Sequence, residues 1–168
     1  MKRRHQWITA IASLGLACGM AQAAEATFTT ASLTPETALK AAQAALASCR
    51  DSGYQVAVSV TDRSGTPIAV LRDRLAGPHT PDTATGKAYT SASFRMSSGE
   101  LAEATQAGQE TSGIRHLSRV VALGGGLPIE AAGSIVGAIG ISGAPGGGAD
   151  EACARAGIDA IQDDLDFQ

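Results

Sequence analysis

The sequence predicts an α+β fold in which helices pack on an antiparallel sheet. Residues 55–61 alternate in polarity, and a short turn joins them to a second strand-like run at 67–72. A second pair of apolar, glycine-containing strands lies between residues 124 and 143. Helical patterns lie before, between and after the two pairs. The order helix, hairpin, two helices, strands and helix therefore favours a layered α+β domain, with no internal repeat and no second domain.

The first 23 residues have the pattern of a secretory signal peptide. A basic start at residues 2–4 precedes an apolar stretch, Trp7–Met20, which is too short to span a bilayer. Ala21-Gln-Ala23 matches the small-x-small cleavage pattern. We therefore expect cleavage before Ala24, a periplasmic or secreted protein, and a flexible polar leader over residues 24–32.

Charge and composition exclude some classes of partner. Cleavage would remove three basic residues and no acidic ones, so the formal net charge of −3 would become −6. This acidic balance argues against nucleic acid as a partner, which needs clustered Lys and Arg. Aromatic residues make up only 4% of the chain, too few for base stacking. No second apolar run is long enough for a membrane span, so we expect none in the mature protein.

The three cysteines leave two questions open. Cys18 raises the alternative of a lipoprotein signal, which Gly15 disfavours because Leu is usual there. Cys49 and Cys153 fall on the apolar faces of predicted helices. An oxidising compartment permits a disulfide between them, but two buried free thiols are an equally physical alternative.

The first helix and hairpin have clear boundary signals. Thr34-Pro35 predicts a capped helix start, and Gly53 its end. The helix between them has an apolar stripe at helical spacing, made of Leu39, Ala42, Leu46 and Cys49. The turn at residues 62–65 then separates the two strands of the hairpin.

The second half of the chain is predicted from caps and glycines. Thr80-Pro81 predicts a helix with Thr80 as its cap, running to about Met96, and Ser98 predicts the cap of a shorter helix. Residues 106–119 are expected to be irregular. Asp150 is predicted to cap a final helix whose buried stripe consists of Ala154, Ile158, Ile161 and Leu165.

The glycine-rich stretch 119–143 is the most distinctive part of the chain. It predicts a tight turn, a short strand, a second turn near residues 131–133, and a buried strand. Gly137, Gly140 and Gly143 recur at every third position of the last strand. Glycine weakens a strand unless another chain must approach closely. We therefore expect a helix, another subunit or a ligand to lie against this backbone.

Two histidines of the mature chain are candidate ligands for iron. His79 and His116 both lie in segments predicted to be irregular, and Pro78 and Pro81 stiffen the loop that holds His79. A single histidine is sufficient as the proximal ligand of haem iron. The alternative is that each ring is solvated or bonds a nearby carbonyl. Zinc-site spacing, a phosphate-binding loop and a complete nucleophile elbow are absent from the sequence.

Cationic side chains near His79 are candidate binding groups for carboxylates. Arg72, Asp73 and Arg74 form a dense charge cluster, and arginine binds planar carboxylates through two hydrogen bonds. The alternative is an exposed hairpin end with weak local ion pairs. Lys87, one turn into the next helix, could contact an anionic ligand or another subunit, or could be solvated.

Several motifs in order resemble the GlcG/HbpS family of haem-binding domains, which also includes the C-terminal domain of PduO. They are Leu33-Thr-Pro-Glu, Val56–Gly65, the loop and helix from Arg72 to Lys87, Gly124-Gly-Gly-Leu-Pro-Ile129, Val136–Gly143 and Asp150-Glu. The resemblance covers nearly the whole mature chain and defines a GlcG/HbpS-like domain over residues 33–168. Gly77-Pro-His-Thr80 departs from the more common Gly-Ala-x-x-x-Ser pattern.

The resemblance implies a fold and a function. The fold would be profilin-like, with an antiparallel sheet of about five strands and flanking helices. Family members form higher homo-oligomers, octamers among them, and secreted members bind haem. We therefore expect a protein that sequesters or transfers haem, with His79 or His116 as the iron ligand and Arg72, Arg74 and Lys87 as candidates for the propionates. A protein or enzyme acting on a small organic acid of the glycolate type is the alternative, and binding is expected rather than catalysis.

Overall fold

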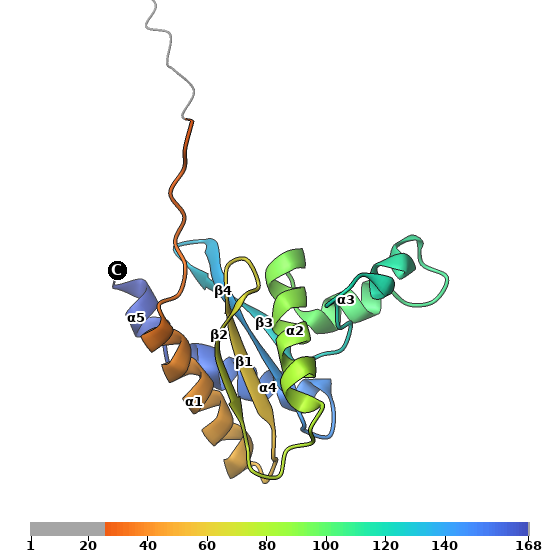
Figure 1. Cartoon of the computed structure of the whole chain (residues 1–168), viewed down its shortest axis with the longest axis horizontal. Coiled ribbons are helices and arrows are strands. Elements are labelled where there is room, and N and C mark those ends of the chain that lie inside the picture. Colours follow the sequence, from red (N-terminus) through yellow and green to blue (C-terminus); the bar gives the residue numbers. More distant parts are fainter. Residues whose placement is uncertain (1–25, 168) are drawn as a thin grey trace, which may run out of the picture.

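A single antiparallel sheet with helices on both faces forms the protein. The computed structural model describes residues 26–167, so the predicted signal peptide lies outside the described residues. Four strands form the sheet in the order β2-β1-β4-β3: β1 (Ala57–Asp62), β2 (Pro67–Arg72), β3 (Gly126–Ala131) and β4 (Ser134–Ser142). Figure 1 shows α1 and α4 on one face of this sheet and α2 on the other. The predicted α+β class is confirmed.

The two hairpins of the sheet join through β1 and β4. Ala57 pairs with Ser142 and Asp62 with Gly137, so β1 and β4 run antiparallel through the middle of the sheet. The expectation of five strands is wrong: residues 26–167 contain four. The long connection before β3 lacks alternating polarity, and Glu110–His116 within it forms a 3-10 helix, η1. Residues 26–32 form no strand and run away from the sheet (Figure 1).

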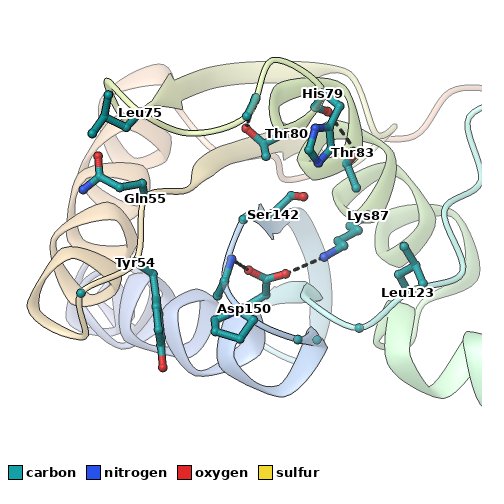
Figure 2. A pocket seen from close by; sticks show the side chains of 18 residues that line it. Tyr54, Gln55, Leu75, His79, Thr80, Thr83, Lys87, Leu123, Ser142 and Asp150 are labelled. Atoms are coloured by element: carbon teal, nitrogen blue, oxygen red, sulfur yellow. Dashed lines mark hydrogen bonds and ion pairs between the residues drawn. The ribbon is translucent and has the colours of Figure 1, made fainter.

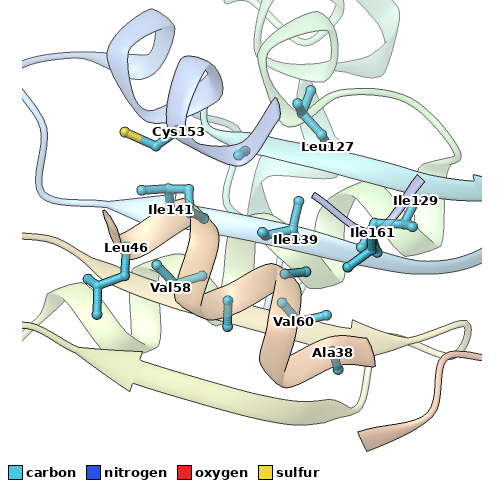
Figure 3. Close-up of a cluster of buried hydrophobic side chains, with 14 of the residues drawn as sticks. Ala38, Leu46, Val58, Val60, Leu127, Ile129, Ile139, Ile141, Cys153 and Ile161 are labelled. Carbon is cyan, nitrogen blue, oxygen red and sulfur yellow. The ribbon is translucent and has the colours of Figure 1, made fainter. Parts of the chain in front are cut away.

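The main core lies between the sheet and the helices α1 (Pro35–Asp51), α4 (Gly147–Asp159) and α5 (Gln162–Asp166). Val58, Val60, Ile139 and Ile141 of the central strands are fully buried there (Figure 3). Alanines dominate the inner face of α1, which lets this helix lie close to α4. A Cys49–Cys153 disulfide joins the two helices, with the Cα atoms 5.5 Å apart. Of the two alternatives left open by the sequence, Cys49 and Cys153 therefore form the disulfide and are not free thiols.

The opposite face of the sheet is covered by α2 (Thr80–Phe94), which α3 (Ser98–Ala104) follows. A Cβ atom added at Gly140 would overlap the carbonyl oxygen of Ala84, and one added at Gly126 would overlap that of Lys87. Glycine is therefore required where helix and strands meet backbone to backbone. The glycine pattern predicted that a helix, another subunit or a ligand lies against this backbone. A helix lies against the middle of β4.

The helix starts differ from the predicted caps in three places. Thr34 caps α1 as predicted, because its hydroxyl accepts the N–H of Thr37. Ser97, one residue before the predicted Ser98, caps α3. His79 and Gly146 occupy the cap positions of α2 and α4, where Thr80 and Asp150 were predicted, and neither helix has a side-chain cap. Asp150 lies inside α4 and has a different role.

Candidate functional site

A cavity of about 790 Å³ opens beside the C-terminal end of the central strand β4. The starts of α2 and α4 form two of its walls, and the segment between α1 and β1 forms a third with the loop after β2 (Figure 2). Its volume lies within the range of about 300–1,000 Å³ that is usual for small-molecule sites. Of the five predicted site residues, His79 and Lys87 line this cavity.

A buried ion pair forms the floor of the cavity. The ammonium Nζ of Lys87 lies 2.7 Å from Oδ2 of Asp150 and donates a second hydrogen bond of 2.9 Å to the carbonyl oxygen of Ile141. Both side chains are 4% exposed. The N–H of Ala144 donates to Oδ1 of Asp150. Lys87 is therefore neither solvated nor free for another subunit, since it holds α4 against α2 and the sheet.

Burial controls the electrostatics of this pair. It raises the pKa of Asp150 above its ordinary value, while the hydrogen bonds from Lys87 and Ala144 act in the opposite direction. Gly125 makes room for the pair: its φ is +117°, and a Cβ there would lie 2.8 Å from Lys87 Nζ. The glycine-rich turn before β3 is thus part of the floor.

His79 lies at the rim of the cavity with an exposed imidazole ring. Its carbonyl oxygen accepts hydrogen bonds from the backbone N–H and the hydroxyl of Thr83, which fixes the backbone of this residue. A Cβ at Gly77 would lie 2.8 Å from Cε1 of the ring, so glycine there lets the ring pack on the backbone. Within residues 26–167 neither ring nitrogen has a hydrogen-bond partner. The imidazole is therefore available to a ligand.

Apolar side chains surround the mouth of the cavity. Leu75 is 78% exposed and Leu123 is 56% exposed, and both line the opening. Tyr54 and Pro145 add further apolar surface. Exposed apolar groups that gather around a concave site mark a binding surface more often than isolated ones do. The opening thus combines a nitrogen donor with apolar walls.

The charge cluster after β2 is organised around a residue that sequence reasoning missed. Arg50 of α1 binds Asp73 through two hydrogen bonds of 2.7 and 3.0 Å, and this interaction lowers the pKa of Asp73 to about 2. Arg72 donates its guanidinium hydrogen bonds to the carbonyl oxygen of Ala76. The carboxylate is therefore satisfied by α1, and Arg72 holds the loop in shape.

The remaining predicted site residues lie outside the cavity lining. Arg74 is exposed and directly precedes Leu75 at the rim. His116 is exposed at the end of η1, on the connection before β3. The structure thus brings together His79 and Lys87 and leaves Arg72, Arg74 and His116 away from the cavity wall.

Two cavity residues that the sequence analysis missed as binding groups are Asp150 and Ser142. A signal for Asp150 existed: Ala84 and Ser91, which share a helix face with Lys87, are small, which is typical of a closely packed face. A lysine on such a face needs an acidic partner. Ser142 gave no signal, because a serine at a strand end is common.

Haem is the group that the motif resemblance implies, and the described residues are compatible with it. They contain no cluster of three or more His, Cys, Asp or Glu side chains that could hold a bare metal ion. Haem needs only one protein ligand together with an apolar pocket. His79, with both ring nitrogens unpartnered at an apolar opening, meets that requirement.

Comparison with known proteins agrees with this fit. The family model described as "Haem degrading protein HbpS-like" matches residues 33–159. The chain belongs to the HbpS-like family. A crystal structure of a double mutant of Streptomyces reticuli HbpS is 34% identical, with a TM-score of 0.76 over 91% of this chain and 99% of that one. The resemblance seen in the motifs is therefore confirmed.

Two further relatives extend the comparison. The crystal structure of a PduOC–haem complex is 29% identical, with a TM-score of 0.73 over 77% of this chain and 95% of that one. An uncharacterised 15.0 kDa protein of Citrobacter freundii is 34% identical over 115 residues, which is 67% of this chain and 81% of that protein. Haem binding is thus found within the same fold. No helix among residues 26–167 is long and apolar enough to cross a membrane.

Proposed function

We propose that the mature protein is a periplasmic or secreted haem-binding protein that sequesters or transfers haem. The observation that carries this proposal is the unpartnered imidazole of His79 at the apolar opening of a 790 Å³ cavity. A PduOC relative with the same fold binds haem. Bound haem would supply an iron centre, and His79 is the residue that would hold it.

Each part of the cavity has a role in this proposal. The His79 ring holds the metal, with its backbone fixed by Thr83 and its ring resting on Gly77. Leu75 and Leu123 cover the faces and edge of a flat apolar ligand and exclude water. Arg74 lies outside the cavity lining, but it is exposed next to Leu75 of the rim, which places it better for a propionate than Arg72, whose guanidinium is already bound to Ala76.

We propose that the protein is exported, on the basis of two observations. The first 23 residues have the signal pattern, and the Cys49–Cys153 disulfide is typical of proteins in oxidising compartments.

We also propose that the protein is a homo-oligomer. The sheet has two unpaired edges, β2 and β3, and β2 carries the exposed Val70. Scattering or sedimentation of the mature chain measures the assembly state directly.

The organic-acid alternative has less support from the geometry. It requires Arg72, Arg74 and Lys87 to converge on one carboxylate. Lys87 is instead neutralised by Asp150, and Arg72 holds a carbonyl outside the cavity lining. Thermal stabilisation by glycolate but not by hemin would favour this alternative over haem, because a ligand that binds only the folded state raises the melting temperature.

A hemin titration tests the proposed function. We expect the mature protein to give a saturable shift of the Soret band, and His79→Ala to abolish or strongly change that shift. His116→Ala is the matched control, because His116 is an exposed histidine outside the cavity, and it should leave the titration unchanged. A Soret shift that survives in His79→Ala would remove His79 as the ligand. Loss of the bound haem's absorption under reductant and oxygen would show degradation rather than storage.

A further inference from the structure

The end of β4 carries a buried polar group that the haem-ligand argument does not use. Ser142 is the last residue of β4 and is 6% exposed. Its hydroxyl lines the cavity and has no hydrogen-bond partner within residues 26–167. Figure 2 shows it directed into the space between His79 and Lys87. The hydroxyl opens into the cavity, so it is available to donate a hydrogen bond to a ligand that enters there.

The start of α4 presents further donors to the same space. The loop after Ser142 contains Gly143, Pro145 and Gly146, and α4 begins at Gly147 without any side-chain cap. Gly146 and Gly147 line the cavity. The first N–H groups of a helix lack internal partners and carry partial positive charge, so they attract anions. Because these residues are glycines, no side chain keeps a ligand away from the backbone.

The adjacent charges favour an anion as well. Lys87 has three ammonium donors, and two of them bind Asp150 and the carbonyl oxygen of Ile141. Asp150 is occupied on both oxygens, by Lys87 and by the N–H of Ala144. The acidic group in the floor is therefore compensated. Beside the ion pair, the groups left to a ligand are donors: the hydroxyl of Ser142, the N–H of Gly147 and one ammonium proton of Lys87. The amide oxygen of Gln55, an unpaired acceptor, comes from a different wall of the cavity (Figure 2).

We propose that Ser142 and the N–H group of Gly147, at the start of α4, form a carboxylate subsite in the floor of the cavity. The inference rests on the proposed function, since haem carries two carboxylate arms and one of them would reach this subsite. A carboxylate suits the set because each of its two oxygens accepts hydrogen bonds. The subsite orients the macrocycle, while His79 at the rim holds the metal.

Comparison of hemin with its dimethyl ester tests the subsite on the haem itself. We expect wild-type protein to bind hemin at least about tenfold more tightly than the diester, the loss expected for a hydrogen bond to a charged group. Ser142→Ala should weaken hemin binding by about tenfold and leave diester binding unchanged. Ser64→Ala is the control, because Ser64 lies in the β1–β2 turn at the other end of the sheet. Equal weakening of both ligands by Ser142→Ala, or none, would overturn the subsite.

A titration with sodium propionate separates the subsite from the haem proposal. We expect saturable ¹H and ¹⁵N shifts of the Gly147 amide signal in NMR spectra. These shifts should be lost in Ser142→Ala and retained in His79→Ala. Propionate binding without any hemin binding would support the subsite and contradict the haem function. Hemin binding without these amide shifts would support the haem function and contradict the subsite. Tighter binding of inorganic phosphate than of propionate would refute a carboxylate site.

Discussion

The floor and the rim of the cavity differ in how their polar groups are satisfied. In the floor, Lys87 and Asp150 are 4% exposed and bind each other as well as the backbone. At the rim, His79 is exposed and its ring has no partner among the described residues. The floor therefore contributes mainly to the folded structure and the rim mainly to binding. Substitutions in the two regions should separate stability from haem affinity.

The largest expected effect is on the floor. Lys87→Met should lower the free energy of unfolding by about 3–5 kcal/mol, because it leaves the buried Asp150 carboxylate without its cation. Urea unfolding measures this loss. The double variant Lys87→Met/Asp150→Leu should recover most of it, since it removes both charges and keeps apolar volume. A double variant less stable than the single one would show that the pair is not the cause.

The second effect concerns the link between α1 and α4. Cys49→Ser/Cys153→Ser should lower the free energy of unfolding by about 2–5 kcal/mol, because the disulfide restricts the unfolded chain. Thermal unfolding of the wild type with and without reductant supplies the control. Reduction should lower the melting temperature of the wild type and leave that of the double variant unchanged. Equal melting temperatures of the two oxidised proteins would contradict this prediction.

A smaller effect is expected in acid. The pKa of Asp73 is lowered to about 2 by Arg50, from a reference value of 3.8. Its carboxylate therefore stabilises the fold above pH 3.8, and this stabilisation is lost as the pH falls towards 2. Asp73→Asn should be less stable than the wild type at neutral pH, and its stability should change less between about pH 4 and pH 2. Parallel pH profiles of the two proteins would show that the Arg50 interaction contributes nothing.

The smallest effect on stability is expected at the rim. Leu75→Ser replaces a side chain that is 78% exposed, so the free energy of unfolding should change by less than about 0.5 kcal/mol. Hemin affinity should fall, because apolar surface that covers the ligand is lost. Val70→Ser, a change of an exposed apolar residue on β2 outside the cavity lining, is the control. Equal hemin affinities of both variants would remove Leu75 from the binding surface.

Sequence reasoning predicted local structure better than it predicted contacts. The hairpin over residues 57–72, the glycine-rich strands and the start of α1 follow from alternation, turns and prolines, which act over a few residues, and the start of α2 was predicted to within one residue. The cap positions of α3 and α4 were wrong because several adjacent polar residues can serve the same helix start. The expected number of about five strands came from the family resemblance, and residues 26–167 form four.

The site was predictable in part. The two flanking prolines drew attention to His79, which lines the cavity, and the motifs indicated the family that the comparisons confirm. Arg50–Asp73 and Lys87–Asp150 join residues 23 and 63 positions apart, and no local pattern specifies such partners. The prediction that Arg72, Arg74 and Lys87 share one anionic ligand treated nearness along the chain as nearness in space.

By itself the sequence determined which segments form helices and strands and which loop holds a histidine, because propensities, turns and caps depend on neighbouring residues. Only the tertiary structure decided which charges are neutralised, which cysteines are joined and which polar groups remain unsatisfied at the cavity. Those outcomes depend on the packing of α2 and α4 against the end of β4. There burial makes an unpaired charge costly and leaves the hydroxyl of Ser142 facing open space.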